Sequence, residues 1–256
     1  MKLITSRDNP FYKELLKLSN SAKARREAKL TLLDGAHLLA AYLDSGLLPA
    51  HIMLNAEALN DDEITALLAR MDGVPLTQLD DKLFAELTEL KTPSGVLALV
   101  QIPQATSQDA HFALLLEDIQ DPGNLGSILR SAAAAGCDAV FLSIGCADVW
   151  SPRVLRAAMG GHLCLHIHER QDLLAVAQAY KGKTYATSLQ AQRSLYDCDF
   201  QGDIAFMVGN EGAGLSPALL ALATQPITIP MLGRVESLNA AAATAICLFE
   251  ALRQRL

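Results

Sequence analysis

The sequence predicts an α/β protein of two domains, and three observations support this prediction. Predicted strands and helices alternate along nearly the whole chain, which is the pattern of sheets covered by helices. Residues 112–117 form a continuous apolar run that ends in a carboxylate, as a buried parallel strand does. Residues 102–109 form a short polar stretch with a proline, which is typical of a domain boundary. We therefore expect one domain over residues 1–104 and another over residues 105–256.

The first domain is expected to be a small α/β sandwich. Residues 10–18 show a basic amphipathic pattern, and residues 61–71 begin with carboxylates, which the positive end of a helix dipole favours. The expected strands cover residues 30–33, 51–54, 74–78 and 95–101. The expected helices cover residues 10–18, 36–44, 61–71 and 82–89.

The second domain is expected to hold a mostly parallel sheet with helices on both faces. Ser151-Pro152 is a typical helix start, with a hydroxyl cap followed by proline at the first helical position. The expected strands cover residues 112–117, 139–143, 163–168, 184–187, 204–208 and 227–229. The expected helices cover residues 124–135, 152–159, 171–179, 217–222 and 238–252. Binding sites in such sheets lie beyond the carboxyl ends of the strands, so the loops after Glu117, Val208 and Ile229 are the candidates.

The composition excludes several classes of protein. The chain has 256 residues, 51% of them apolar and 19% charged, so it can bury a sizeable core and is not a disordered chain. Its apolar runs are too short for a membrane span, and the first ten residues hold no hydrophobic signal core. The five cysteines form no C-x-x-C pair, which fits a reducing compartment. We expect a cytoplasmic protein.

The charge is distributed unevenly along the chain. The net charge is −7, yet residues 1–30 hold eight lysines and arginines against three carboxylates. This basic arm has two interpretations: it contacts phosphate, or it is an ordinary solvated helix face.

The first candidate loop leads from a strand through Pro122-Gly123 into a helix. Free N–H groups at a helix N-terminus suit an anion or a polar substrate. Ser127 and Arg130 are three residues apart and so share a face of that helix. The alternative is a plain turn followed by a surface arginine.

The second candidate loop, residues 208–216, holds three glycines in the spacing G-x-x-G-x-G. This is neither the dinucleotide fingerprint nor a phosphate-binding P-loop. Glycines allow a ligand to approach the backbone closely, and Glu211 lies between two of them. The alternative is a tight turn in which Glu211 caps the next helix.

The third candidate loop runs from Ile229 to Asn239 and precedes the last predicted helix. Ser237 or Asn239 is suited to cap that helix. Alternatively, Asn239 presents its amide to a ligand.

Together these loops resemble, in order, the three sequence motifs of the SpoU/TrmH family of RNA ribose 2′-O-methyltransferases, within the SPOUT superfamily. The matching segments are Asp121-Pro122-Gly123-Asn124-Leu125-Gly126 with Arg130, Gly209-Asn210-Glu211-Gly212 with Gly214-Leu215-Ser216, and Ile229-Pro230-Met231 with Ser237-Leu238-Asn239. Residues 6–10, 22–26 and 33–35 look like that family's N-terminal RNA-binding domain, so the resemblance covers nearly the whole chain.

The resemblance implies a fold, a cofactor and an assembly. The implied fold has a trefoil-knotted C-terminal chain, and the implied assembly is a homodimer that uses the closing helix. The implied cofactor is S-adenosylmethionine, held largely by backbone groups. The residues that match cofactor-binding positions are Leu189, Gly209, Asn210, Gly212, Ile229, Met231, Ser237, Leu238 and Asn239.

The implied reaction is attack of a ribose 2′-hydroxyl on the activated methyl group, which needs no metal. The family gives a key role to the arginine that matches Arg130. Because arginine holds its proton up to a pKa above about 12, we favour electrostatic stabilisation of the developing alkoxide over a proton-acceptor role. Asn124 and Glu211 would orient the hydroxyl or the arginine, and Ser237 and Asn239 would position the substrate ribose or the cofactor.

The RNA contacts are expected from basic residues of the first domain and of the helix that follows Ser151. These candidates are Arg7, Lys23, Arg25, Arg26 and Arg153. The separate RNA-binding domain favours ribosomal RNA over transfer RNA. The alternatives are a transfer-RNA enzyme, a catalytically silent RNA-binding protein and a NAD-dependent oxidoreductase, the last lacking its G-x-G-x-x-G fingerprint here.

Four residues of types that bind metals, His162, Cys164, His166 and His168, alternate along the strand predicted over residues 163–168 and just before it. They would share one face of the strand. A metal site needs ligands that converge from more than one element. We expect no metal there.

Overall fold

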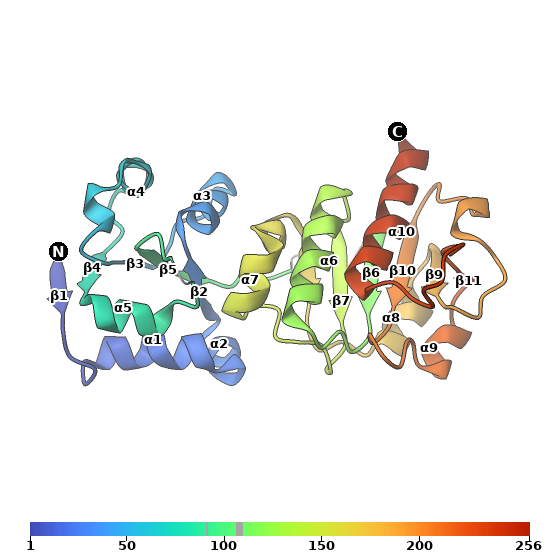
Figure 1. The fold of residues 1–256 in the computed structure, drawn as a ribbon, viewed down its shortest axis with the longest axis horizontal. Coiled ribbons are helices and arrows are strands. Elements are labelled where there is room, and N and C mark those ends of the chain that lie inside the picture. Colours follow the sequence, from blue (N-terminus) through green and yellow to red (C-terminus); the bar gives the residue numbers. More distant parts are fainter. Residues whose placement is uncertain (91, 106–109) are drawn as a thin grey trace. The chain divides into compact units, whose positions relative to one another are not determined.

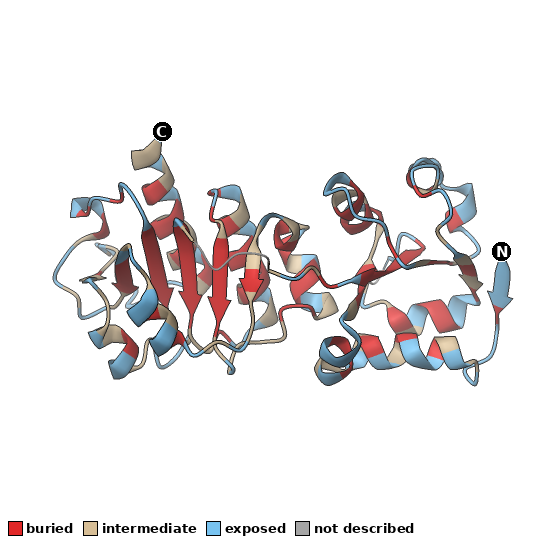
Figure 2. Cartoon of the chain, turned by 180° about the vertical axis from the view of Figure 1, so that it is seen from behind, coloured by how far each residue is buried: buried red, intermediate tan, exposed pale blue. Residues whose placement is uncertain are grey.

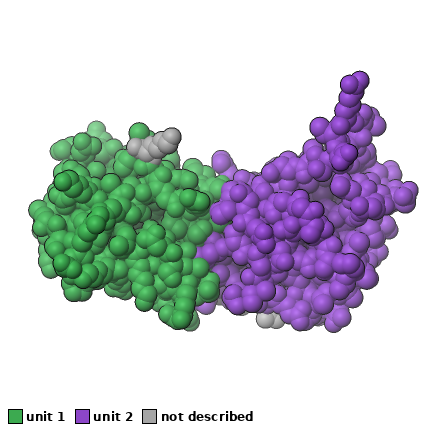
Figure 3. All heavy atoms as spheres, turned by 60° about the horizontal axis from the view of Figure 1, so that its bottom comes forward, with its two compact units in different colours: residues 1–103, 150–163 green, residues 104–149, 164–256 purple. Residues whose placement is uncertain are grey.

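The computed structural model describes residues 1–90, 92–105 and 110–256. The chain divides into two compact units (Figure 3), each described below by itself. The first comprises Met1–Pro103 and Trp150–Leu163, and the second comprises Gln104–Val149 and Cys164–Leu256. The segment Trp150–Leu163, which we expected within the second domain, therefore packs with the first unit. Thr31 Oγ1 donates a hydrogen bond of 2.8 Å to the carbonyl of Trp150.

The first unit is built on a five-stranded mixed sheet of order β1-β4-β3-β5-β2. Strands β1, β4 and β3 are parallel, and β5 runs antiparallel to both β3 and β2. The strands are β1 (Lys2–Ile4), β2 (Leu30–Asp34), β3 (His51–Leu54), β4 (Leu76–Leu79) and β5 (Val96–Gln101). The helices are α1 (Pro10–Asn20), α2 (Ala22–Ala28), α3 (Ala36–Asp44), α4 (Asp62–Leu68), α5 (Asp81–Leu87) and α7 (Pro152–Ala158), with short 3₁₀ turns η1 (Ala58–Asn60) and η2 (Gly161–Cys164).

Helices cover both faces of this sheet, as the α/β sandwich prediction requires. Helices α1, α2 and α5 lie on one side and α3 and α4 on the other (Figure 1). Tyr12 and Leu15 of α1 are fully buried against β2, β3 and β5 in the main apolar cluster. The Asn9 side chain caps α1 by accepting hydrogen bonds from the amides of Phe11 and Tyr12, which explains where the helix begins.

The second unit holds a six-stranded sheet of order β11-β9-β10-β6-β7-β8, in which every pairing is parallel. The strands are β6 (Phe112–Leu116), β7 (Ala139–Leu142), β8 (His166–His168), β9 (Lys183–Thr187), β10 (Ile204–Val208) and β11 (Gln225–Ile227). The helices are α6 (Pro122–Ala134), α8 (Leu173–Ala179), α9 (Pro217–Ala221) and α10 (Ala240–Arg255), with one 3₁₀ turn, η3 (Leu195–Asp197).

Helices α6 and α10 pack together on one face of the second sheet, and α8 and α9 lie on the other (Figure 1). All five residues of both β6 and β10 are buried, so the centre of the sheet forms the core (Figure 2). This confirms the prediction of a parallel sheet covered on both faces. No helix in the described part of the chain is long and apolar enough to cross a membrane.

The strand predicted over residues 163–168 is wrong in its first half. Gly161–Cys164 form the 3₁₀ turn η2, and only His166–His168 form strand β8. His162 and Cys164 therefore do not share a strand face with His166 and His168. The His168 ring stacks on Phe141, with centroids 4.6 Å apart. Among the described residues, no group of three or more His, Cys, Asp or Glu side chains could hold a metal ion.

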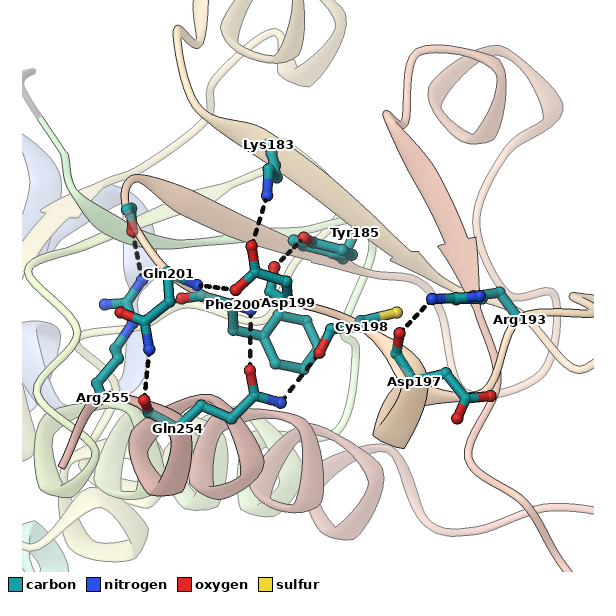
Figure 4. Close-up of polar contacts among 11 residues, drawn as sticks. Lys183, Tyr185, Arg193, Asp197, Cys198, Asp199, Phe200, Gln201, Gln254 and Arg255 are labelled. Carbon is teal, nitrogen blue, oxygen red and sulfur yellow. Dashed lines mark hydrogen bonds and ion pairs between the residues drawn. The ribbon is translucent and has the colours of Figure 1, made fainter.

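The C-terminal end of α10 is fixed to the loop that precedes β10 (Figure 4). Gln254 accepts a hydrogen bond from the Phe200 amide at 3.0 Å and donates one to the Cys198 carbonyl at 3.0 Å. The Arg255 guanidinium donates to the carbonyl of Phe200 and lies over the Phe112 ring, 4.4 Å from its centroid. This explains why the helix continues to Arg255, three residues beyond its predicted end.

The Glu250 carboxylate supports the same helix end and makes stability depend on pH. It is 9% exposed and accepts hydrogen bonds from Arg253 and Gln254, which lower its pKa from 4.5 to about 2. A depressed carboxylate pKa stabilises the fold above the unfolded-state value and loses that contribution as pH falls toward the folded-state value. Glu250→Gln should therefore be less stable than the parent at pH 7, by a margin that shrinks between pH 4.5 and about 2.

Urea unfolding from pH 7 to pH 3 measures this difference. The exposed Glu27, whose one ion pair within the described part of the chain is with Lys23 at 3.7 Å, supplies a matched control, and Glu27→Gln should track the parent at every pH. A constant difference between Glu250→Gln and the parent over that range would contradict the assignment.

Candidate active site

The three candidate loops meet at the carboxyl edge of the second sheet. Strands β6, β9, β10 and β11 are parallel, so their carboxyl ends lie at one edge. Strand β11 ends at Ile227, two residues before its predicted end, and so Ile229 belongs to the loop. The loop after β9, which carries Leu189, joins the other three.

These loops enclose a pocket of about 290 Å³. Apolar side chains and glycine backbone dominate its lining. Eight of the nine residues predicted to bind the cofactor lie around it: Leu189, Gly209, Asn210, Gly212, Ile229, Met231, Ser237 and Leu238. The ninth, Asn239, is not among the lining residues. The structure thus brings together residues that are up to 49 positions apart, although their roles stay a prediction.

The glycine loop after β10 folds back on itself and leaves no room for a side chain at Gly209. A Cβ atom there would lie 2.1 Å from the carbonyl carbon of Gly214. Asn210 and Gly214 exchange two main-chain hydrogen bonds, of 3.0 and 2.9 Å, and Gly214 has a φ of +71°. The Asn210 side chain accepts from the amides of Gly212 and Ala213 and donates to the carbonyl of Asp118 at 2.8 Å.

A chain of hydrogen bonds joins one residue from each motif. Asn239 Nδ2 donates to Asn124 Oδ1 at 2.8 Å, and Asn124 Nδ2 donates to Glu211 Oε1 at 3.1 Å. Asn239 also caps α10, since its Oδ1 accepts from the amides of Ala241 and Ala242. Asn239 therefore caps the helix, as one of its two interpretations predicts, and its amide donates to a neighbouring side chain; presentation of that amide to a ligand stays a prediction. Ser237 does not cap the helix, which begins at Ala240.

Glu211 is the acceptor at the end of this chain and does not cap the following helix, whose cap is Ser216. Its carboxylate also accepts from the main-chain amides of Gln120 and Asp121, both at 3.3 Å. Burial raises the pKa of Glu211, but the hydrogen bonds from Asn124, Asp121 and Gln120 together outweigh it and hold the pKa below its ordinary value. Glu211 is therefore an anion at neutral pH.

Arg130 lies on α6, exposed, and its guanidinium makes no hydrogen bond or ion pair to the described residues. Arg130 is the ninth residue of α6, more than two turns from its N-terminus. In the helix predicted from residue 124 it would have been the seventh, so it lies farther from the positive end of the helix dipole than predicted. Ser127 is exposed on the same face. The guanidinium is available to an anionic or polar ligand.

The residues predicted to bind RNA differ in how far they are available. Arg25 is 4% exposed, and its guanidinium donates to the carbonyls of Leu18 and Ser19, which leads us to remove it from the proposed contacts. Arg7 pairs with Glu86, and Arg153 Nε donates to Glu89 at 3.1 Å. Lys23 lies 3.7 Å from Glu27, and Arg26 is exposed.

The fold and the pocket define a class: α/β enzymes that bind a small-molecule ligand in loops at the carboxyl edge of a parallel sheet. Residues 111–249 match the SpoU rRNA Methylase family, and residues 9–98 match the MRM3-like substrate binding domain. The chain belongs to the SpoU rRNA Methylase family.

Three relatives illustrate the similarity. An uncharacterized tRNA/rRNA methyltransferase of Synechocystis sp. is 35% identical, over 98% of this chain and 94% of the relative. The 23S rRNA (guanosine(2553)-2′-O)-methyltransferase of Bacillus subtilis is 33% identical, over 97% of this chain and 98% of the relative. The crystal structure of an AdoMet-bound rRNA methyltransferase of Sinorhizobium meliloti superposes with a TM-score of 0.84, at 28% identity over 100% of this chain and 98% of the other.

Proposed function

We propose that this chain transfers a methyl group from S-adenosylmethionine to the 2′-hydroxyl of a ribose in ribosomal RNA. The observation that carries the proposal is the pocket at the sheet edge, together with the Asn239–Asn124–Glu211 chain that joins the three motifs. A NAD-dependent reaction has no such support, since the glycine loop lacks the dinucleotide fingerprint. The intact site likewise argues against a silent RNA-binding protein.

The residues around the pocket fit S-adenosylmethionine. Leu189, Ile229 and Leu238 offer apolar surface for an adenine ring, and the glycine loop exposes main-chain groups that can read its edge. The volume of about 290 Å³ lies near the lower end of the range for small-molecule sites. When bound, this cofactor supplies a methyl group already activated on a sulfonium ion.

The chain's own residues then act on the ribose. In the transfer, the 2′-oxygen would bond to the methyl carbon as the carbon–sulfur bond breaks, which would leave S-adenosylhomocysteine, and the hydroxyl proton would pass to water. Arg130, with no other partner among the described residues, stabilises the negative charge that develops on that oxygen. Asn124 and Asn239 orient the reacting group, and the Glu211 anion holds Asn124 in place.

The first unit is the proposed RNA-binding part. Its match to a substrate-binding domain and the names of the relatives favour ribosomal over transfer RNA. Arg7, Lys23, Arg26 and Arg153 are the proposed phosphate contacts. The side chains of Arg7, Lys23 and Arg153 are 72%, 80% and 67% exposed, so each can leave its carboxylate for a phosphate at little cost.

Three further properties belong to the proposal. The C-terminal chain forms a trefoil knot, as the resemblance implies. Two copies associate through α10, where Phe249 is 46% exposed and offers an apolar contact. The protein works in the cytoplasm, which its five free cysteines and its relation to a bacterial 23S rRNA enzyme favour.

Transfer of labelled methyl from S-adenosylmethionine tests the proposed function. Ribosomal and transfer RNA from cells lacking the protein serve as separate substrates. We expect label in ribosomal RNA only, and stabilisation of the protein by S-adenosylhomocysteine but not by NAD. Label in transfer RNA alone would show that the protein is instead a transfer-RNA ribose methyltransferase. Cofactor binding without label in RNA or in immature ribosomal particles would identify a silent binding protein.

A further inference from the structure

The loop after β6 is held between the loops of its two neighbouring strands. Strand β6 lies between β10 and β7 in the sheet, so the loops after these strands flank it. On the β10 side, Asn210 Nδ2 donates to the Asp118 carbonyl, and Glu211 accepts from Gln120 and Asp121. On the β7 side, the Ala147 amide donates to the Ile119 carbonyl at 2.8 Å.

Asp118 is the point at which this loop turns. Its φ is +54°, a left-handed conformation that costs energy for any residue other than glycine, although Asp and Asn tolerate it best. The Ser143 hydroxyl closes a ring with it: Oγ accepts from the Asp118 amide at 2.9 Å and donates to Asp118 Oδ1 at 2.6 Å. This pair holds the main chain and the side chain of Asp118 at once.

The β7 side leaves space for the Asp118 carboxylate. A Cβ atom on Gly145 would lie 2.2 Å from Asp118 Oδ1 and 2.5 Å from its Cγ. Gly145 has no left-handed φ, so the lack of a side chain there is a matter of space alone. The loop Ser143–Gly145 therefore leaves room for the Asp118 carboxylate, which a side chain at position 145 would fill.

We propose that Asp118 and Ser143 are positioning residues for methyl transfer, an inference that rests on the proposed function. Their pair fixes the turn that aims the amides of Gln120 and Asp121 at Glu211 and the Asp118 carbonyl at Asn210. Glu211 in turn holds Asn124. Neither Asp118 nor Ser143 lines the cofactor pocket, so the pair acts on the reacting geometry through other residues.

Ser143→Ala removes both hydrogen bonds between the hydroxyl and Asp118, together with the 3.6 Å contact between the hydroxyl and Cys146 Sγ. We expect kcat to fall by about 10- to 100-fold, since small displacements of catalytic groups are that costly, with KM for S-adenosylmethionine changed less than about threefold. Asp118→Asn keeps both the tolerance for positive φ and an acceptor oxygen, and should retain most of the parent's kcat. Asp118→Ala keeps neither, and its kcat should fall as far as that of Ser143→Ala.

Thr184→Val is the matched control. Like the Ser143 hydroxyl, the Thr184 hydroxyl accepts a hydrogen bond from one main-chain amide, at 2.9 Å, and it also contacts one carbonyl. Thr184 lies at the amino end of β9, whereas the site lies at the carboxyl edge of the same sheet. Both variants should lower the melting temperature, and only Ser143→Ala should lower kcat. Equal kcat for Ser143→Ala and Thr184→Val would overturn the proposal.

Hydrogen exchange separates this inference from the proposed function. The amides of Gln120 and Asp121 should exchange at least about tenfold faster in Ser143→Ala than in the parent, and at the parental rate in Thr184→Val. This holds whether or not the parent methylates RNA, so an inactive parent defeats only the proposed function. Unchanged exchange in Ser143→Ala would defeat the positioning role.

Discussion

Arg130→Ala should lower kcat for methyl transfer by about 10²- to 10³-fold, the loss typical of removing one donor that stabilises developing charge. Arg130 does not line the cofactor pocket, so the Kd for S-adenosylhomocysteine should change less than about twofold. Because the side chain is exposed and makes no bond to the described residues, the melting temperature should stay within about 1–2 °C of the parent. Steady-state kinetics, calorimetric titration and thermal unfolding measure the three quantities.

Arg130→Lys distinguishes the two roles considered for this side chain. Lysine keeps the positive charge but loses the planar fork, so electrostatic stabilisation predicts partial activity that declines as pH approaches the lysine pKa of about 10.4. A proton acceptor predicts the reverse, with activity rising as lysine loses its proton. Near-normal turnover of Arg130→Ala, with Asn124→Ala and Glu211→Ala inactive, would show that the role of Arg130 is misassigned.

Gly209→Ala should have the second large effect, this time on cofactor binding. The new Cβ atom would lie 2.1 Å from the carbonyl carbon of Gly214 and 2.2 Å from the Leu215 nitrogen, and these main-chain atoms can move only if the loop opens. Such overpacking costs about 1–3 kcal/mol. We expect a loss of that size in the free energy of unfolding. The Kd for S-adenosylhomocysteine should rise by at least about tenfold, which corresponds to 1.4 kcal/mol.

Gly233→Ala is the control for this variant, because a Cβ atom at Gly233 would meet no heavy atom of the described residues within 4 Å, its two chain neighbours aside. It should bind S-adenosylhomocysteine and unfold like the parent in the same titrations and melts. If Gly209→Ala bound the cofactor product as tightly as Gly233→Ala does, the pocket would not depend on the closed glycine loop.

The sequence predicted those parts of the fold in which a local pattern and the tertiary structure agree. Strand β10 and helix α3 have the predicted bounds, since an apolar run or a helical period marks each of them. Strand β1 is only three residues long and depends on pairing with β4, so no local pattern marks it. Helix α2 was missed because charged residues fill four of its seven positions and obscure its apolar face.

The candidate site was predictable where glycine and motif spacing mark a loop. The positioning pair was not, because Asp118 and Ser143 are 25 residues apart and each looks like an ordinary loop residue. Nor does the sequence distinguish Arg25, which is buried on main-chain carbonyls, from its exposed neighbour Arg26. Contacts of this kind depend on how distant loops come together, which local periodicity does not encode.

The position of the transferred methyl group tests the central claim most directly. A 2′-hydroxyl is the nucleophile in alkaline cleavage of RNA, so a methyl group on that oxygen protects the adjacent phosphodiester bond. Ribosomal RNA labelled by the parent protein should yield its label in alkali-resistant dinucleotides, and Arg130→Ala should yield almost none. Label recovered in mononucleotides would place the methyl group on a base and contradict the account.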